Sequence, residues 1–396
     1  MPIIPSKTNE KESFTCVNNF IAKLSQKIIT CSSDTVKIAC NLMAAILDKD
    51  KKLLQKYCEE GLPDDLPMLR AYIWKIILNY LPEDPEMWEQ TLKAKREQYN
   101  LYKSFIKIKL QNEFKEKTYK SKEILERIIK DVYRTNAQIA FFFEPTDKTR
   151  VKTEEECVKM LERRKTCTFK NVEEIYYDET ENEIHVDVLK RILFIYSIIC
   201  PDISYHQGMN ELLAPIYYIY SYDKEFTEET EENIEADSFW SFHYLMSKIS
   251  QSFVSPNDQG LAIKAFIFEK CLDYVDDEIT NSLRRLNIMS EFYCYKWFIL
   301  LYSQEFEIND LFKLWDLILS QEDKYYYTIY IGMAILIMKK NTIVNGQMYE
   351  VMNTLQNFSD INIIDLIKKT REINIENKEG LDLFILKTKK ISHDFS

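Results

Sequence analysis

Arg134 is the first residue whose type and spacing could do chemistry. It lies near the end of the segment Ile128-Ile129-Lys130-Asp131-Val132-Tyr133-Arg134-Thr135. Ile128 and Val132 fall on one apolar face of a predicted helix. Asp131 stands three positions before Arg134, the spacing at which side chains on a helix meet. The segment therefore predicts a guanidinium beside a carboxylate. The competing interpretation is a solvated helix Arg whose pairing with Asp131 contributes only about 0.2–0.5 kcal/mol.

Gln207 is the second such residue, in the polar stretch Asp202-Ile203-Ser204-Tyr205-His206-Gln207-Gly208-Met209-Asn210. Pro201 is expected to end the preceding helix, and Gly208 permits a tight turn. A Gln on such a turn is expected to reach outward. The competing interpretations are an ordinary polar turn residue for Gln207 and, for Tyr205, a ring that packs locally and hydrogen-bonds through its hydroxyl.

Several familiar catalytic and binding motifs are absent from the sequence. It contains no GxxxxGK[ST] phosphate-binding loop, no HExxH and no GxSxG. Its four histidines lie far apart along the chain: His185, His206, His243 and His393. A histidine-centred hydrolase has no support, and the sequence shows no means of binding a nucleotide or a metal ion by itself.

Composition narrows the class of protein and its partners. The chain has 396 residues, with 52 Lys and Arg against 63 Asp and Glu, for a net charge of −11. Such an acidic chain is a poor partner for nucleic acid or anionic lipid. Its nine Cys include no CxxC pair, which is typical of reduced cytosolic thiols. No signal peptide is recognisable, and the longest apolar stretch, residues 325–338, is shorter than the ~18–20 residues that span a bilayer. A cytoplasmic protein is expected.

Helical periodicity recurs along almost the whole chain. One apolar face is traced by Ile124, Leu125, Ile128, Ile129 and Val132, at helical spacing. Strand signals are scarce, and six Gly are too few for the turns of an all-β fold. Two charged stretches, residues 144–183 and the acidic run 223–237, are expected to be loops, the second of them solvated. The sequence predicts an all-α fold with charged loop insertions.

The two polar segments resemble the two signature motifs of the TBC domain, which is found in activators of Rab GTPases. These motifs are Ile128-x-x-Asp131-x-x-Arg134 and Tyr205-x-Gln207-Gly208-Met209. Further blocks follow the order of the family: Gly61-Leu62-Pro63, Leu69-Arg70, Ile73 to Pro82, Phe239-Trp240, Trp297-Phe298 and Leu314-Trp315-Asp316. The layout is similar to that of short, single-domain members.

The resemblance implies a fold of two helical subdomains. It also implies a mechanism in which two side chains, an arginine finger and a glutamine finger, are supplied in trans to the active site of a partner. Arg134 would enter the active site of a Rab GTPase in its GTP state, and Gln207 would orient the attacking water. Other residues of the motifs would support these two: Asp131, Thr135, Tyr205, Gly208, Met209 and Asn210. The chain would need no cofactor of its own, because the partner carries GTP and magnesium, and any recruitment to endomembranes would be peripheral.

The resemblance also sets the expected domain boundaries. Residues 1–48 would be an N-terminal extension, 49–340 the TBC domain, and 341–396 C-terminal helices and a tail. Arg134 and Gln207 are 73 positions apart, more than in compact members, because of the charged insertion 144–183. Two alternatives stay open: a catalytically silent TBC-like adaptor that binds a small GTPase or another trafficking partner, and a helical scaffold. The activator and the adaptor both require Arg134 and Gln207 on one exposed face.

Overall fold

The computed structural model describes residues 15–116, 120–135, 139–146, 183–222, 224–250, 253 and 259–393. Over this part of the chain the regular elements are helices, and the β-structure is one isolated antiparallel bridge between Pro145 and Ile184. The predicted all-α class is confirmed. Within the same residues, no helix combines the length and the apolar character that would let it cross a membrane.

The chain divides into two compact units, one formed by Met1–Tyr57 with Pro63–Leu245 and the other by Cys58–Leu62 with Met246–Ser396. The helices whose bounds fall mainly in the first unit are α1 (Thr15–Ile28), α2 (Ser33–Leu47), α3 (Lys51–Glu60), α4 (Pro67–Ile77), η1 (Pro85–Met87), α5 (Trp88–Glu116), α6 (Lys120–Val132), η2 (Ala140–Phe143), α9 (His185–Ile199), α10 (Met209–Tyr222), α11 (Lys224–Thr227) and α12 (Glu231–Ile249). The second unit holds α14 (Gln259–Val275), α15 (Asp277–Arg285), α16 (Glu291–Ile299), α17 (Ile308–Ser320), α18 (Lys324–Met338), α19 (Lys340–Asn345), α20 (Met348–Gln356) and α21 (Ile363–His393).

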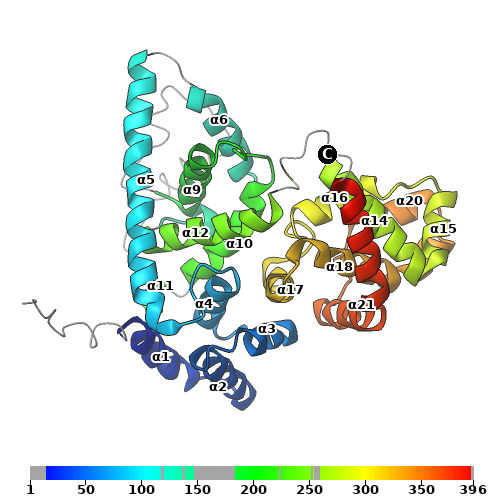
Figure 1. Ribbon diagram of the computed structural model, residues 1–396, viewed down its shortest axis with the longest axis horizontal. Coiled ribbons are helices and arrows are strands. Elements are labelled where there is room, and N and C mark those ends of the chain that lie inside the picture. Colours follow the sequence, from blue (N-terminus) through cyan, green and yellow to red (C-terminus); the bar gives the residue numbers. More distant parts are fainter. Residues whose placement is uncertain are drawn as a thin grey trace, which may run out of the picture. The chain divides into compact units, whose positions relative to one another are not determined.

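The core of the first unit is built around α9 and α10. Both helices are buried on nearly all sides, as their continuous apolar sequences require. Figure 1 shows α5, α6 and α12 around α9, and α4 packs against α10. This arrangement fixes the end of α6 and the connection from α9 to α10, the two segments that carry Arg134 and Gln207.

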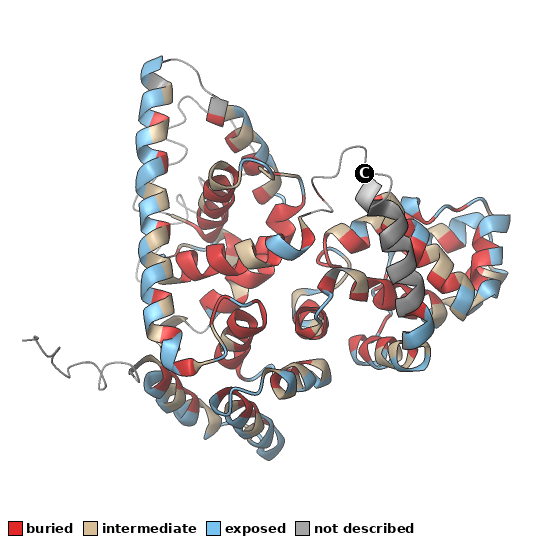
Figure 2. Cartoon of the chain, viewed as in Figure 1, coloured by how far each residue is buried: buried red, intermediate tan, exposed pale blue. Residues whose placement is uncertain are grey.

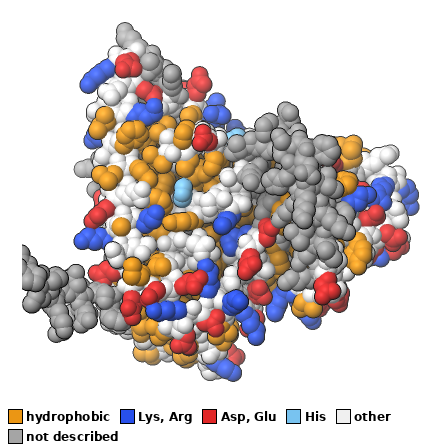
Figure 3. Space-filling model, viewed as in Figure 1, with side chains coloured by type: hydrophobic (Ala, Val, Ile, Leu, Met, Phe, Trp, Pro, Cys, Tyr) orange, Lys and Arg blue, Asp and Glu red, His pale blue; other side chains and the backbone are white. Residues whose placement is uncertain are grey.

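The long helix α5 contributes only one side to this core. Its buried face includes Trp88, Tyr99 and Ile106, whereas Leu101 and Phe105 are more than half exposed on the opposite side. The helix is therefore a wall of the unit, exposed along its outer side (Figure 2). Figure 3 shows hydrophobic side chains on the visible face of the first unit, among scattered charged residues.

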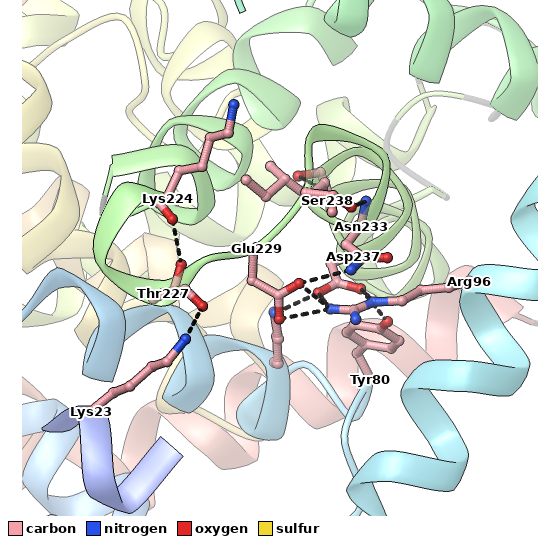
Figure 4. A network of polar contacts seen from close by, with 12 residues as sticks. Lys23, Tyr80, Arg96, Lys224, Thr227, Glu229, Asn233, Asp237 and Ser238 are labelled. Carbon is pink, nitrogen blue, oxygen red and sulfur yellow. Dashed lines mark hydrogen bonds and ion pairs between the residues drawn. The ribbon is translucent and has the colours of Figure 1, made fainter. Parts of the chain in front are cut away.

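The prediction that residues 223–237 form a solvated loop is wrong for most of the described part of this stretch, although residues 228–230 lie between two helices and Glu228 is exposed. Residues 224–227 form α11, and α12 begins at Glu231. Asp237 is 1% exposed, and its carboxylate accepts hydrogen bonds from Lys75 Nζ at 2.6 Å, Tyr80 Oη at 2.7 Å and Arg96 Nε at 2.9 Å. Figure 4 shows part of this network. Asp237 can be buried because its partners come from α4, α5 and the turn between them, more than 130 positions away.

Glu235, two residues before Asp237, is buried in the same way. It accepts hydrogen bonds from Tyr99 Oη at 2.7 Å and from Arg191 Nη2 at 2.6 Å. Arg191 also pairs with Glu183, which stands where the charged stretch 144–183 returns to the fold. α5, α9 and α12 are thus joined by buried ion pairs as well as by apolar contacts.

The predicted insertion 144–183 lies mostly outside the described residues, which include only its two ends. These ends run side by side: the Thr146 backbone N–H donates to the Glu183 carbonyl at 3.0 Å, and the His185 N–H donates to the Glu144 carbonyl at 3.2 Å. These two hydrogen bonds lie on either side of the antiparallel bridge between Pro145 and Ile184. The stretch therefore leaves and re-enters the first unit at one place, at the start of α9.

Candidate functional site

Arg134 lies in the turn that follows α6. The helix is held in the core by Leu125, Ile128, Ile129 and Val132, whose side chains are at most 1% exposed. The helix ends at Val132, and the chain enters a turn at Tyr133. In this turn the Arg134 backbone N–H donates to the Asp131 carbonyl at 2.9 Å. The Arg134 side chain is exposed. A rigid helix thus ends in a guanidinium directed to solvent.

Gln207 lies in the connection between α9 and α10. The α9 helix ends at Ile199, just before Pro201, as predicted. The carbonyl of Cys200 then accepts hydrogen bonds from the backbone N–H groups of Ile203 at 3.1 Å and Ser204 at 2.7 Å, which turns the chain back. Gly208 has a φ of +99°, a left-handed conformation that strongly favours glycine. The Gln207 side chain is exposed on this turn, as predicted.

Two hydrogen bonds join the Arg134 segment to the Gln207 segment. The buried Tyr205 hydroxyl donates to the Asp131 carboxylate at 2.8 Å. Asn210 Nδ2 donates to the Thr135 hydroxyl at 2.6 Å. The bonds flank the two exposed side chains, because Asp131 and Thr135 stand on either side of Arg134, and Tyr205 and Asn210 on either side of Gln207. The turns that carry Arg134 and Gln207 are thereby held against each other.

Asn210 is the centre of this network. It is 4% exposed. Its amide nitrogen donates to Thr135 and to Glu211, and its amide oxygen accepts from the Gly208 N–H at 3.2 Å. The Tyr205 oxygen lies 3.1 Å from the same amide oxygen, but the single hydroxyl proton of Tyr205 is directed to Asp131 by the shorter bond at 2.8 Å. Both N–H donors of the amide and its oxygen are therefore used. Fixing the Gly208 N–H also fixes the turn from which Gln207 projects.

Burial, together with the neighbouring Asp131 carboxylate, raises the pKa of Tyr205 above its ordinary value. The hydroxyl therefore keeps its proton at physiological pH and stays a donor to Asp131. Met209 has a structural position as well: its side chain is fully buried, and its sulfur accepts from the His206 backbone N–H at 3.4 Å.

The expected contact between the side chains of Asp131 and Arg134 is not found. No ion pair joins these two described residues, and the Asp131 carboxylate is bonded to Tyr205 instead. The reason is that Arg134 lies beyond the last helical residue, so the i, i+3 geometry of a helix does not apply to it. Asp131 holds Arg134 through its backbone carbonyl, which also accepts from the Thr135 N–H at 3.1 Å and the Thr135 hydroxyl at 3.2 Å.

Glu211 belongs to the network but was not among the predicted residues. It is 6% exposed and accepts from Asn210 Nδ2 at 3.2 Å. The signal for it in the sequence is weak: a single carboxylate at the start of an apolar helix, which is equally typical of a first-turn acid that interacts with the helix dipole.

The fold and this site together define the class of protein. The family model of the Rab-GTPase-TBC domain matches residues 144–344, just over half of the chain. The chain belongs to this family, and the predicted family membership is confirmed. The matched range includes Gln207 and begins ten residues after Arg134, so Arg134 is linked to the motif by its contacts in the structure.

The relatives agree with this placement. The chain is 27% identical to human TBC1 domain family member 13, over 80% of this chain and 90% of that protein. It is 24% identical to the GTPase-activating protein GYP7 of Candida glabrata, over 82% of this chain but 40% of that protein.

Two solved structures share the fold. The crystal structure of the Ypt/Rab-GAP domain of Gyp1p superposes with a TM-score of 0.64 at 19% identity, covering 84% of this chain and 94% of that one. A flagellar RabGAP TBC domain from Chlamydomonas gives 0.51 at 14% identity, covering 93% and 97%.

Proposed function

We propose that this chain accelerates GTP hydrolysis by a Rab-family GTPase, with Arg134 and Gln207 entering the partner's active site. The observation that carries the proposal is the pairing of two exposed side chains on turns that are tied together by Tyr205–Asp131 and Asn210–Thr135. An adaptor that only binds a GTPase has no chemical need for this pair of residues.

The chemistry of phosphoryl transfer fits the two side chains. Catalysis of this reaction depends on stabilising charge and positioning the attacking water, and needs no covalent group from the protein. A guanidinium has a planar, permanently charged fork that can bridge phosphate oxygens. An amide can donate to and accept from one water molecule at once. An arginine supplied in trans contributes roughly 10³–10⁵ in rate in the Ras system, or about 4–7 kcal/mol.

The nucleotide and its magnesium ion would come with the partner, and the chain would engage the GTP-bound state. The family name and the names of the solved relatives refer to Rab proteins, which supports a Rab as the partner class. Asp131, Thr135, Tyr205 and Asn210 would hold the two fingers in position, and Gly208 would allow the turn beneath Gln207. A cytoplasmic location, with peripheral recruitment to endomembranes, is part of the same proposal.

The test is phosphate release from a panel of purified Rab proteins of the source organism, loaded with GTP and measured under single-turnover conditions with and without the full chain. Acceleration of at least one Rab by several hundredfold is expected. Saturable binding to GTP-loaded Rab proteins without faster hydrolysis of any of them would overturn the proposal and favour the adaptor.

A further inference from the structure

The second unit contains a small pocket between α14, α15 and the turn that leads to α16. Its volume is about 240 Å³. Buried apolar side chains form much of its lining: Leu272, Leu283, Ile288 and Tyr293. Sites for small molecules usually have about 300–1,000 Å³. The pocket is therefore suited to a single bulky apolar side chain, and small for a complete metabolite.

The end of α15 builds one wall of this pocket. The Asn287 backbone N–H donates to the Arg284 carbonyl at 3.0 Å, and the Ile288 N–H donates to the Leu283 carbonyl at 2.9 Å. Asn287 has a φ of +54°, a left-handed conformation that Asn tolerates better than most residues. This cap directs Ile288 inward and leaves Met289 outside. The shape of the pocket is thus set by backbone hydrogen bonds.

Large apolar side chains are exposed around the pocket. Met289, which lines it, is 57% exposed, and Phe292, in the first turn of α16, is 62% exposed. Phe266, one turn before the pocket residue Glu269 on α14, is 51% exposed. Single exposed apolar residues are ordinary, but exposed apolar residues on two of the segments that line a concave pocket are typical of an interaction site.

The charge around the pocket is negative. Arg284 and Glu269 line the pocket, and Arg284 is bonded to Glu269 at 2.9 Å and to Asp273 at 3.0 Å, so that one cation stands between two carboxylates. Across the segment 266–293 there are six acidic side chains against three basic ones, and Lys340 pairs with two of the acids, Asp276 and Glu278, which leaves an excess of two negative charges. A basic partner is attracted to this surface, whereas a second copy of it, or an anionic membrane, is repelled.

We propose that this pocket docks a basic, amphipathic polypeptide segment of a partner protein. One bulky apolar side chain of the segment enters the pocket, Met289 and Phe292 cover it, and flanking Lys or Arg side chains face Glu269 and Asp273. The site is built wholly within the second unit, so the proposal does not depend on the GTPase-activating function.

The experiment measures binding of fluorescent short peptides to the full chain by anisotropy. The probes have a central Leu, Phe or Trp between Lys and Arg residues, with one matched set that has a central Ala and another that has Glu in place of the basic residues. Saturable binding is expected for the basic peptides with a bulky centre, and at least tenfold weaker binding for both matched sets. Binding of none of the bulky basic peptides, or equal binding of the Ala or Glu peptides, overturns the proposal.

Two substitutions locate the binding. Met289→Ser and Phe292→Ser are each expected to weaken it at least tenfold without unfolding the chain, because both side chains are exposed. Met348→Ser is the matched control, since Met348 is 56% exposed but lies on α20. Equal loss in the control, or binding that Met289→Ser and Phe292→Ser leave unchanged, would contradict the site. Self-association that depends on Met289 in sedimentation would assign the surface to a second copy and would also contradict it.

Discussion

The Arg134 side chain is exposed, although the helix that leads to it is anchored in the core by Leu125, Ile128, Ile129 and Val132. We expect Arg134→Ala to lower the stimulated rate of GTP hydrolysis about 10³-fold, because it removes the guanidinium that stabilises the charge on the transferring phosphoryl group. Arg134→Lys should recover little of this, since a single ammonium cannot bridge several oxygens. Single-turnover phosphate release measures both effects.

The control for this substitution is Arg285→Ala, which removes an exposed Arg on α15 in the second unit. It should leave the stimulated rate within about threefold of the original, since a single exposed side chain away from the turn has no part in the chemistry. Undiminished activity of Arg134→Ala at a saturating concentration would exclude Arg134 from the chemistry.

Gln207 is expected to act on water rather than on charge. We predict that Gln207→Ala lowers the stimulated rate about 10²–10³-fold, the usual effect of removing one positioned hydrogen-bonding group from an active site. Affinity for the GTP-loaded Rab, measured by titration, should change much less. Gln111→Ala, which removes an exposed Gln on α5, serves as the matched control. A loss of affinity that accounts for the whole loss of rate would assign Gln207 to binding instead.

At the scale of elements, the end of α6 and the α9–α10 turn work as one unit because of Tyr205 and Asn210. Tyr205→Phe removes the hydroxyl that donates to Asp131 and leaves that carboxylate without this partner. We expect a loss of about 1–3 kcal/mol in the free energy of unfolding. We also expect a fall in the maximal stimulated rate that exceeds any change in KM for the Rab.

Tyr349→Phe is the control, since the Tyr349 hydroxyl belongs to a side chain that is 83% exposed. A double-mutant cycle with Asp131→Asn separates the pair from its surroundings. If Tyr205→Phe and Asp131→Asn were fully additive in both stability and rate, the bond between them would have no role in holding the fingers.

At the scale of the whole molecule, buried ion pairs join distant parts of the first unit. Burial alone would raise the pKa of Asp237, but Lys75 and Arg96 outweigh it and hold the pKa well below its ordinary value of 3.8. The native state then binds this proton more weakly than the unfolded chain does. The stabilisation is therefore complete above about pH 5 and decreases as the pH falls toward the native pKa.

Asp237→Asn should accordingly lower the free energy of unfolding by about 3–5 kcal/mol at neutral pH, because Lys75 and Arg96 lose a buried counterion. The variant should also lose less stability than the original chain as the pH falls below about 4. Urea unfolding at a series of pH values measures both differences. Glu232→Gln, an exposed acid on the same helix, should show neither. A parallel pH dependence of Asp237→Asn and the original chain would contradict this assignment.

The sequence by itself determined most of the helices and the two exposed side chains of the candidate site. Apolar spacing is a local property, so the buried face of α6 could be predicted directly, as could the end of α9 before Pro201. The motif around Gln207 could also be recognised, because a turn that needs Gly208 depends only on neighbouring residues.

Only the tertiary structure decided which polar groups are buried and what they bind. The acidic run 223–237 looks solvated in sequence, yet Asp237 is buried against Lys75 of α4 and Arg96 of α5, and Glu235 against Arg191 of α9. Asp131 looks like a partner of Arg134, yet its carboxylate bonds to Tyr205, 74 positions away. The physical reason is the same in both cases. Burying a charge is favourable only when a partner meets it, and that partner is supplied by the packing of distant helices rather than by the adjacent chain.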